Sequence, residues 1–205
     1  MSNTRLIAMV ALSAGLLVPG LLAAQDPRLG RRLDSATLEA VAGVIDSARH
    51  EGLPIEPLVQ RALKSAAKRA AAAQIVAAVK RLAQELALAR EALGSSSSPA
   101  ELDAAASALR AGVQVTDLTQ LRQRRAQSLT VALATLADLV TSGVPPDSAA
   151  AAVIALAASA RDDEIAEFRR AVERDIALGA PPAVATSVRV DAALHQTGGA
   201  TPRRP

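Results

Sequence analysis

Only two residues of this 205-residue chain have side chains that titrate near neutral pH, the histidines His50 and His195. The chain has no Cys, which removes thiol nucleophiles, disulfides and Cys-ligated zinc. His50 lies in what we expect to be the last turn of a helix, just before Gly52, where the helix dipole favours a partly charged imidazole. His195 closes the last expected helix in the same way. We therefore expect capping or surface roles for both and no catalytic pair.

The short motifs that organise many enzyme active sites are also missing. The sequence contains no G-x-S-x-G, no G-x-x-x-x-G-K-[ST] and no H-E-x-x-H. We therefore expect a protein that is not an enzyme, with no catalytic residues, no cofactor and no identifiable small-molecule substrate. A site made of carboxylates and Arg stays open as an alternative, although nothing in the sequence selects one.

Four carboxylates at the start of one expected helix form the densest acidic cluster: Asp162, Asp163, Glu164 and Glu167. Divalent cations such as Ca²⁺ take about six oxygen ligands, whereas one helical turn offers two or three on one side. The helix dipole itself favours acids in a first turn, where Asp162 or Asp163 can cap the helix. Arg169 and Arg170 follow at ion-pairing spacing. We expect a solvated, ion-paired face and no metal site.

The basic residues are concentrated in one segment, between residues 61 and 90, which holds seven cations and a single acid, Glu85. Its candidate anion-binding or partner-binding residues are Arg61, Lys64, Lys68, Arg69, Lys80 and Arg81. The stretch 147–175 is acidic, with seven carboxylates and four Arg. Such a bipolar chain can bind a protein partner, anionic lipid or the acidic region of another copy. The alternative is a solvated basic face without a ligand.

Nucleic acid is not an expected partner, because Phe168 is the only aromatic residue and bases have nothing to stack on. Phe168 itself fits a core position, with Ile165 and Val172 at helical spacing around it. The run Arg122–Arg125 lies at the end of a short expected helix, where cations interact favourably with the dipole.

The amino terminus has the layout of a secretory signal peptide, residues 1–24. Arg5 precedes an apolar run from Leu6 to Val18, and the small pair Ala23–Ala24 comes just before polar residues. We therefore expect an exported protein, periplasmic or extracellular. The alternative is an uncleaved membrane anchor over residues 6–24, a length within the ~17–25 residues that span a bilayer.

Forty-nine residues are Ala, the strongest helix former, and Tyr and Trp are absent, so the composition predicts an all-α fold. Breaks of similar sequence recur at Gly52-Leu53-Pro54, Gly112-Val113, Gly143-Val144-Pro145-Pro146 and Gly179-Ala180-Pro181-Pro182. Gly can end a helix in the left-handed conformation and Pro can start the next. We expect about nine short antiparallel helices in αα-hairpins, arranged as a helical repeat or a bundle. Their expected ranges are 34–50, 54–68, 73–93, 99–110, 115–124, 128–142, 146–159, 162–178 and 181–195.

The stretch after Pro57 has no Gly or Pro as far as Leu93, so helix propensity alone would draw one continuous helix. The apolar stripes before and after residue 70 fall on nearly opposite faces of such a helix. We therefore predict a turn at 69–73, and a continuous helix over 57–93 would contradict the argument.

The expected organisation has five parts after the signal peptide. A polar lead-in (25–33) precedes an amino-terminal group of three helices (34–94), a Ser linker (95–98), a helical-repeat region (99–196) and a disordered tail (197–205). The sequence Ser98-Pro99-Ala100-Glu101 predicts a capping box at the first helix after the linker.

Three segments resemble a loosely defined group of exported, Ala- and Arg-rich helical bacterial proteins of unknown function, which share G-[LV]-P-x-[DE] helix breaks. They are GLPIEPLVQRAL (52–63), GVPPDSAAAAV (143–153) and RAVERDIALGAPP (170–182). In that group the break between the second and third helices usually contains Lys-Gly and a Pro, whereas this chain has Lys68-Arg69-Ala70. The resemblance implies the helical punctuation and assigns no functional residue.

These observations favour an exported, non-enzymatic helical protein that acts as a structural or binding module of the cell envelope. Its expected partner is an unknown protein or a second copy, with an anionic lipid surface as a further option. The alternative is a membrane-associated protein retained by an uncleaved amino-terminal helix, with its basic helices facing anionic lipid.

Overall fold

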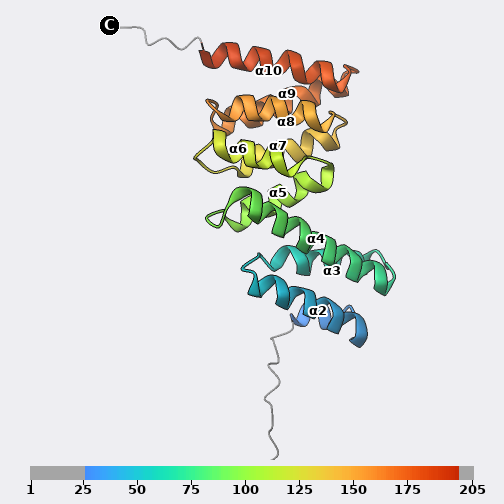
Figure 1. Cartoon of the computed structure of the whole chain (residues 1–205). Coiled ribbons are helices and arrows are strands. Elements are labelled where there is room, and N and C mark those ends of the chain that lie inside the picture. Colours follow the sequence, from blue (N-terminus) through green and yellow to red (C-terminus); the bar gives the residue numbers. More distant parts are fainter. Residues whose placement is uncertain (1–25, 199–205) are drawn as a thin grey trace, which may run out of the picture.

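The computed structural model describes residues 26–198, and within that range the chain forms ten α-helices and no strand (Figure 1). The helices are α1 (Pro27–Gly30), α2 (Ser35–His50), α3 (Glu56–Ala67), α4 (Ala72–Leu93), α5 (Pro99–Ala111), α6 (Val115–Arg124), α7 (Thr130–Thr141), α8 (Pro146–Ala157), α9 (Asp162–Ala177) and α10 (Pro182–Gly198). The all-α expectation is confirmed. The nine expected helices are present, each end within three residues of its expected place.

The expectations for the two termini fall mostly outside this range. The signal peptide, the alternative anchor at 6–24 and residues 199–205 of the expected tail all lie beyond the described residues. The tail was expected to begin at residue 197, but the backbone of α10 stays helical to Gly198, so that boundary is wrong by two residues.

The helices stack side by side into an elongated array with α2 at one end and α10 at the other (Figure 1). The even-numbered helices form one layer, in which α2, α4, α6, α8 and α10 pack in sequence. In the second layer α5 packs on α7 and α7 packs on α9. The two layers share one continuous apolar core.

Small side chains let these helices approach closely, as the α5–α7 pair shows. This pair is the most extensive helix contact in the described range. On α5 the residues Ala105, Ala106 and Ala108 are fully buried, and short side chains bring helix axes towards the ~8 Å end of the usual range. The lone aromatic, Phe168, is 4% exposed on α9, which confirms its expected core position.

The helix breaks repeat one backbone design, in which two amide groups after the helix donate back to its last carbonyls. At Gly143 (φ 94°), the amide of Gly143 donates to the carbonyl of Val140 and that of Val144 to Leu139, both at 3.0 Å. Val144 is then buried, at 1% exposure, and anchors the turn. Gly52, Gly112 and Gly179 end their helices in the same way, so the expected left-handed Gly positions are confirmed.

The turn predicted at 69–73 is also present, since α3 ends at Ala67 and α4 begins at Ala72. The same two hydrogen bonds occur, from Arg69 to Ala66 (2.9 Å) and from Ala70 to Ser65 (3.2 Å). Here the left-handed residue is Arg69, with φ 55°. A side chain in that conformation costs about 1–2 kcal/mol that Gly would avoid.

The segment 25–33, expected as a polar lead-in, contains the short helix α1. Asp26 caps it by accepting the amide of Arg28 at 2.8 Å, and Leu29 is 2% exposed in the core. One apolar residue among charged neighbours gives no periodic signal, which explains why the helix was not expected.

The stretch 95–98 is an ordered connection between α4 and α5, which pack directly on each other. The predicted capping box is present, with the Ser98 hydroxyl accepting the amide of Glu101 (3.2 Å) and the Glu101 carboxylate accepting that of Ser98 (2.8 Å). The second oxygen of Glu101 accepts the amide of Leu129 (2.8 Å) at the start of α7. Burial raises the pKa of Glu101, but these hydrogen bonds together outweigh it and leave the pKa below the ordinary value.

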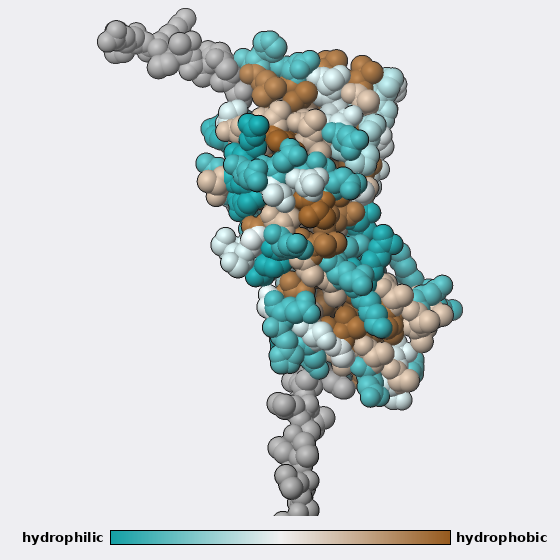
Figure 2. Space-filling view, viewed as in Figure 1, coloured by the Kyte–Doolittle hydropathy of each residue, from teal (hydrophilic) through white to brown (hydrophobic). Residues whose placement is uncertain are grey.

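The end of the array at α10 is partly apolar on its outer face. Val184 and Val188 are 53% and 57% exposed, and apolar side chains gather on the surface over this helix (Figure 2). This is the pattern of a terminal helix that has a neighbour on one side only.

A candidate anion-binding groove between α3 and α5

The layer of odd-numbered helices has one interruption, because α3 and α5 do not pack against each other while α5, α7 and α9 do. Helix α4 has 22 residues, against 12 for α3 and 13 for α5. The two shorter helices can therefore both pack on α4 without meeting. Between them lies an open groove of about 1110 Å³, which residues of α1 also line.

The groove, which we call the α3–α5 groove, is basic. Its lining includes six cations: Arg28, Arg31, Arg32, Arg61, Lys64 and Arg110. Only two carboxylates line it, Glu56 and Asp103, so its formal charge is +4. Apolar side chains complete the lining, among them Pro54, Pro57, Leu63, Leu82 and Pro99.

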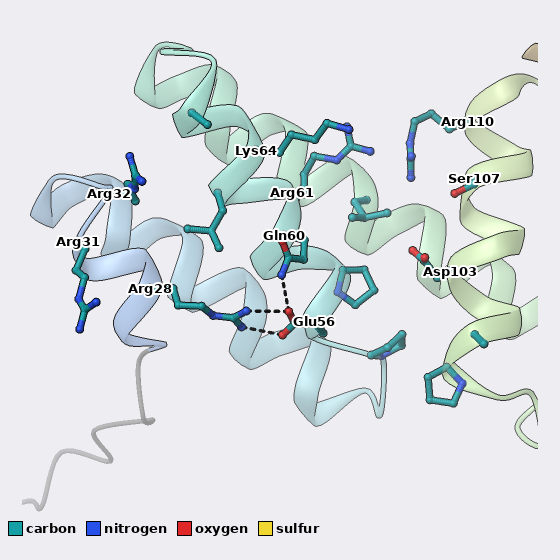
Figure 3. Close-up of a pocket in the computed structure, with 17 residues that line it drawn as sticks. Arg28, Arg31, Arg32, Glu56, Gln60, Arg61, Lys64, Asp103, Ser107 and Arg110 are labelled. Carbon is teal, nitrogen blue, oxygen red and sulfur yellow. Dashed lines mark hydrogen bonds and ion pairs between the residues drawn. The ribbon is translucent and has the colours of Figure 1, made fainter.

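One of the six cations is neutralised within the groove. Arg28 holds the carboxylate of Glu56 through two hydrogen bonds of 3.0 and 2.8 Å, and Gln60 donates a third at 2.7 Å (Figure 3). The hydrogen bonds from Arg28, and then from Gln60, lower the pKa of Glu56. This pair ties α1 to the start of α3 and closes one end of the groove.

A second cation, Arg110, is positioned by a buried carboxylate outside the lining. Glu85 of α4 is 7% exposed and accepts two hydrogen bonds from Arg110, from Nε at 3.0 Å and from Nη2 at 2.9 Å. Arg81 donates to the other oxygen of Glu85 at 3.2 Å. One carboxylate therefore serves two guanidinium groups, and this cluster keeps a net positive charge.

Arg61 and Lys64 face Arg110 across the groove from one side of α3 (Figure 3). Neither forms an ion pair or a hydrogen bond with residues 26–198, and Arg61 is half-buried. Burial, followed by the nearby charge of Arg110, lowers the pKa of Arg61, and only weaker attraction to Glu85 and Asp103 opposes this. A half-buried cation beside another cation gains when an anion arrives.

The six basic residues expected as one patch do not form a single surface. Arg61 and Lys64 line the groove, and Arg81 joins the cluster at Glu85. Lys68 and Arg69 lie in the exposed turn between α3 and α4, and Lys80 is exposed on α4.

The groove also contains four cations that the sequence did not single out: Arg28, Arg31, Arg32 and Arg110. The pair Arg31-Arg32 was visible as a local basic signal in the segment 25–33. Arg110 is isolated in the sequence and becomes significant only through its tertiary contact with Glu85.

The run Arg122–Arg125 differs from its expected role as dipole partners on a helix end. Arg125 is 6% exposed and its guanidinium donates to the carbonyls of Ser128 (3.0 Å) and Ala160 (2.6 Å). It also pairs with Asp162 at 2.5 Å, so it joins the α6–α7 loop to the α8–α9 turn.

The acidic cluster on α9 is occupied by ion pairs. Asp163 and Glu164 contact Arg161, and Glu167 contacts Arg170. The helix is not capped by Asp162 or Asp163 as expected, because Arg161 is the N-cap and its amide donates to Glu164 at 2.7 Å. Within residues 26–198 no group of three or more acidic or His side chains is arranged to hold a metal ion.

The two histidines occupy the expected helix ends. His50 closes α2 and His195 lies in the last turn of α10, both exposed. The structure places them on the first and last long helices of the array, at opposite ends (Figure 1).

None of the ten helices described here is both long and apolar enough to cross a membrane. No family model, curated protein or solved structure matches this chain.

Proposed function

We propose that this protein is an exported, non-enzymatic binding module of the cell envelope, which holds an anionic partner in the α3–α5 groove. The observation that carries the proposal is the set of facing cations, with Arg61 and Lys64 opposite Arg110 and no carboxylate paired to the first two within the described chain. Such pre-positioned charges attract a partner of opposite sign and fix its orientation.

The lining favours binding over catalysis. It includes one hydroxyl, Ser107, and no imidazole. Its chemical groups are mainly hydrogen-bond donors with fixed positive charge, and Arg does not lose its proton in proteins. A nucleophile beside a general base, the arrangement that group transfer needs, is not among the residues that line this groove.

The export part of the proposal rests on the amino-terminal pattern of Arg5, the apolar run Leu6–Val18 and the small residues Ala23–Ala24. Intact-mass measurement on the native protein tests it. Loss of residues 1–24 supports export, whereas a retained Met1 or Ser2 supports the alternative of a membrane-retained protein.

The binding part is tested with three anionic ligands of different classes: poly-L-glutamate, inorganic polyphosphate and vesicles containing phosphatidylglycerol. Wild type and the double variant Arg61→Gln/Lys64→Gln are compared by equilibrium binding at 0.15 M salt. Gln keeps much of the side-chain stem and the helix propensity while removing the charge. The proposal expects weaker binding of at least one ligand by the variant, and equal binding of all three would contradict it.

A further inference from the structure

We infer that the α3–α5 groove binds an extended acidic peptide segment of another protein, with a carboxylate between Arg61, Lys64 and Arg110 and apolar side chains on the groove floor. This inference rests on the proposed function and names the class of partner. It follows from the donor geometry, the apolar lining, the shape of the site and the positions of the chain's own acids.

The donor geometry suits carboxylates, because the groove and its wall already hold two of them by guanidinium groups. Arg28 grips both oxygens of Glu56, and Arg110 donates two hydrogen bonds to Glu85. Guanidinium groups recognise the planar carboxylate through paired N–H donors. Arg61 presents a third guanidinium in the same groove, without a carboxylate partner in residues 26–198.

The floor supplies a second chemical requirement. Pro54 and Pro57 lie at the start of α3, Leu63 follows on that helix, and Leu82 of α4 contributes from beneath at 4% exposure. A purely ionic polymer such as polyphosphate would leave this apolar surface in contact with water. A peptide with apolar residues between its acids covers it and gains from the burial.

The shape of the site disfavours a membrane surface as the ligand. Arg61, Lys64 and Arg110 project into the gap between α3 and α5 (Figure 3). A flat bilayer cannot reach recessed cations from both walls at once, whereas an extended chain can lie between them. The exposed cations outside the groove, Lys68 and Lys80, then provide a matched set that the peptide does not touch.

The protein's own chain does not supply the acidic segment. Residues 1–25 and 199–205 contain no Asp or Glu. The carboxylates of α9 are engaged in ion pairs, including Glu167 with Arg170 and Asp175 with Arg189. A second copy would have to break such pairs in order to use them, so the acids come from a different protein.

The test uses the full chain and a fluorescent, capped peptide of about ten residues with alternating Glu and Leu, which spans ~33 Å when extended. Peptides of alternating Gln and Leu and of alternating Glu and Ser serve as ligand controls. Affinity is measured by fluorescence anisotropy at 0.15 M salt for wild type, Arg61→Gln/Lys64→Gln and the matched variant Lys68→Gln/Lys80→Gln. Both variants lose two positive charges, and circular dichroism checks that each remains folded.

We expect the groove variant to weaken binding of the Glu–Leu peptide by about 10-fold or more, and the matched variant by about 2-fold or less, since exposed charges beyond a Debye length are screened. The Gln–Leu and Glu–Ser peptides should bind more weakly to wild type than the Glu–Leu peptide. Equal losses in the two variants, or equal binding of the three peptides, would overturn the inference.

The proposed function and the partner class can fail separately. If polyphosphate or phosphatidylglycerol vesicles depend on Arg61 and Lys64 while the Glu–Leu peptide does not, the peptide assignment is wrong and the binding groove stands. If no ligand depends on these two residues, both are wrong.

Discussion

Replacing Arg125 by Ala should destabilise the array more than any other single loss of charge in the described chain. Its guanidinium donates to the carbonyls of Ser128 (3.0 Å) and Ala160 (2.6 Å), with a longer bond to Ala157 (3.4 Å). Ala157 and Ala160 are 2% and 4% exposed, so water cannot readily replace the donor. Truncation therefore leaves buried carbonyl groups without a partner.

The expected cost is about 3–5 kcal/mol, the range found when one partner of a buried charged interaction is removed. The Asp162 side chain is 47% exposed and can be hydrated again, so most of the loss comes from the backbone acceptors. Hydrogen bonds from a charged donor contribute about 1.5–3 kcal/mol each, although not additively. The cost is a large part of the ~5–15 kcal/mol that stabilises a typical folded protein.

Urea unfolding followed by far-UV circular dichroism is the appropriate assay, since the chain has no Trp or Tyr to report by fluorescence. Arg124→Ala is the matched control, because Arg124 is exposed and adjacent and should change stability by no more than ~0.5 kcal/mol. Arg125→Lys should fall between the two, since an ammonium group cannot reproduce the planar fork. A cost below 1 kcal/mol for Arg125→Ala, or an equal cost for Arg124→Ala, would refute this explanation of the loop contact.

The remaining predictions concern the core, one buried carboxylate and the helix breaks. Phe168→Ala should cost about 3–5 kcal/mol in urea unfolding, and a cost below 1 kcal/mol would place the ring outside the core. The carboxylate of Glu101 has a lowered pKa in the folded state, so its contribution is complete above pH 4.5, its ordinary pKa, and is lost as the pH falls below that value; Glu101→Gln should therefore lose less stability on acidification than wild type, and parallel pH profiles would contradict this. Gly143→Ala should cost about 1–2 kcal/mol because of its positive φ, while Gly43→Ala, inside α2 with open space around the added methyl group, should stabilise by about 0.4–1 kcal/mol, and thermal melts showing the same sign for both would be inconsistent with this explanation. Arg69→Gly should raise the free energy of unfolding by about 0.5–1 kcal/mol by relieving the left-handed residue, and a loss of stability would show that the Arg69 side chain makes a compensating contact.

The positions of the helices could be predicted because their ends are encoded locally. At Gly143 the conformational freedom of Gly and the Pro residues that follow act within a few residues of the break. The turn at Arg69 carries neither signal and was found from the change of apolar face instead. Helix α1 gave no such pattern, because Leu29 alone anchors it.

The candidate site could be predicted only in part, because its residues come together through packing across the array. Arg61 and Lys64 are one turn apart on a helix and were visible as basic residues. Arg110 lies far from them in the sequence and is directed to the groove by Glu85, a buried acid that looked like a minor exception in a basic segment. The buried contacts of Arg125 likewise depend on a turn 35 residues away.

The location of the groove has a simple structural cause. In a helical array the inner face of each helix is buried by its neighbours, so an open site requires two helices of one layer to stay apart. Helix α4 creates this separation, since its 22 residues extend ~33 Å and exceed the reach of α3 on one side and α5 on the other. The long Gly- and Pro-free stretch that favours a long helix in the sequence is therefore also the element that opens the groove, and the cations gather on the helices that border it.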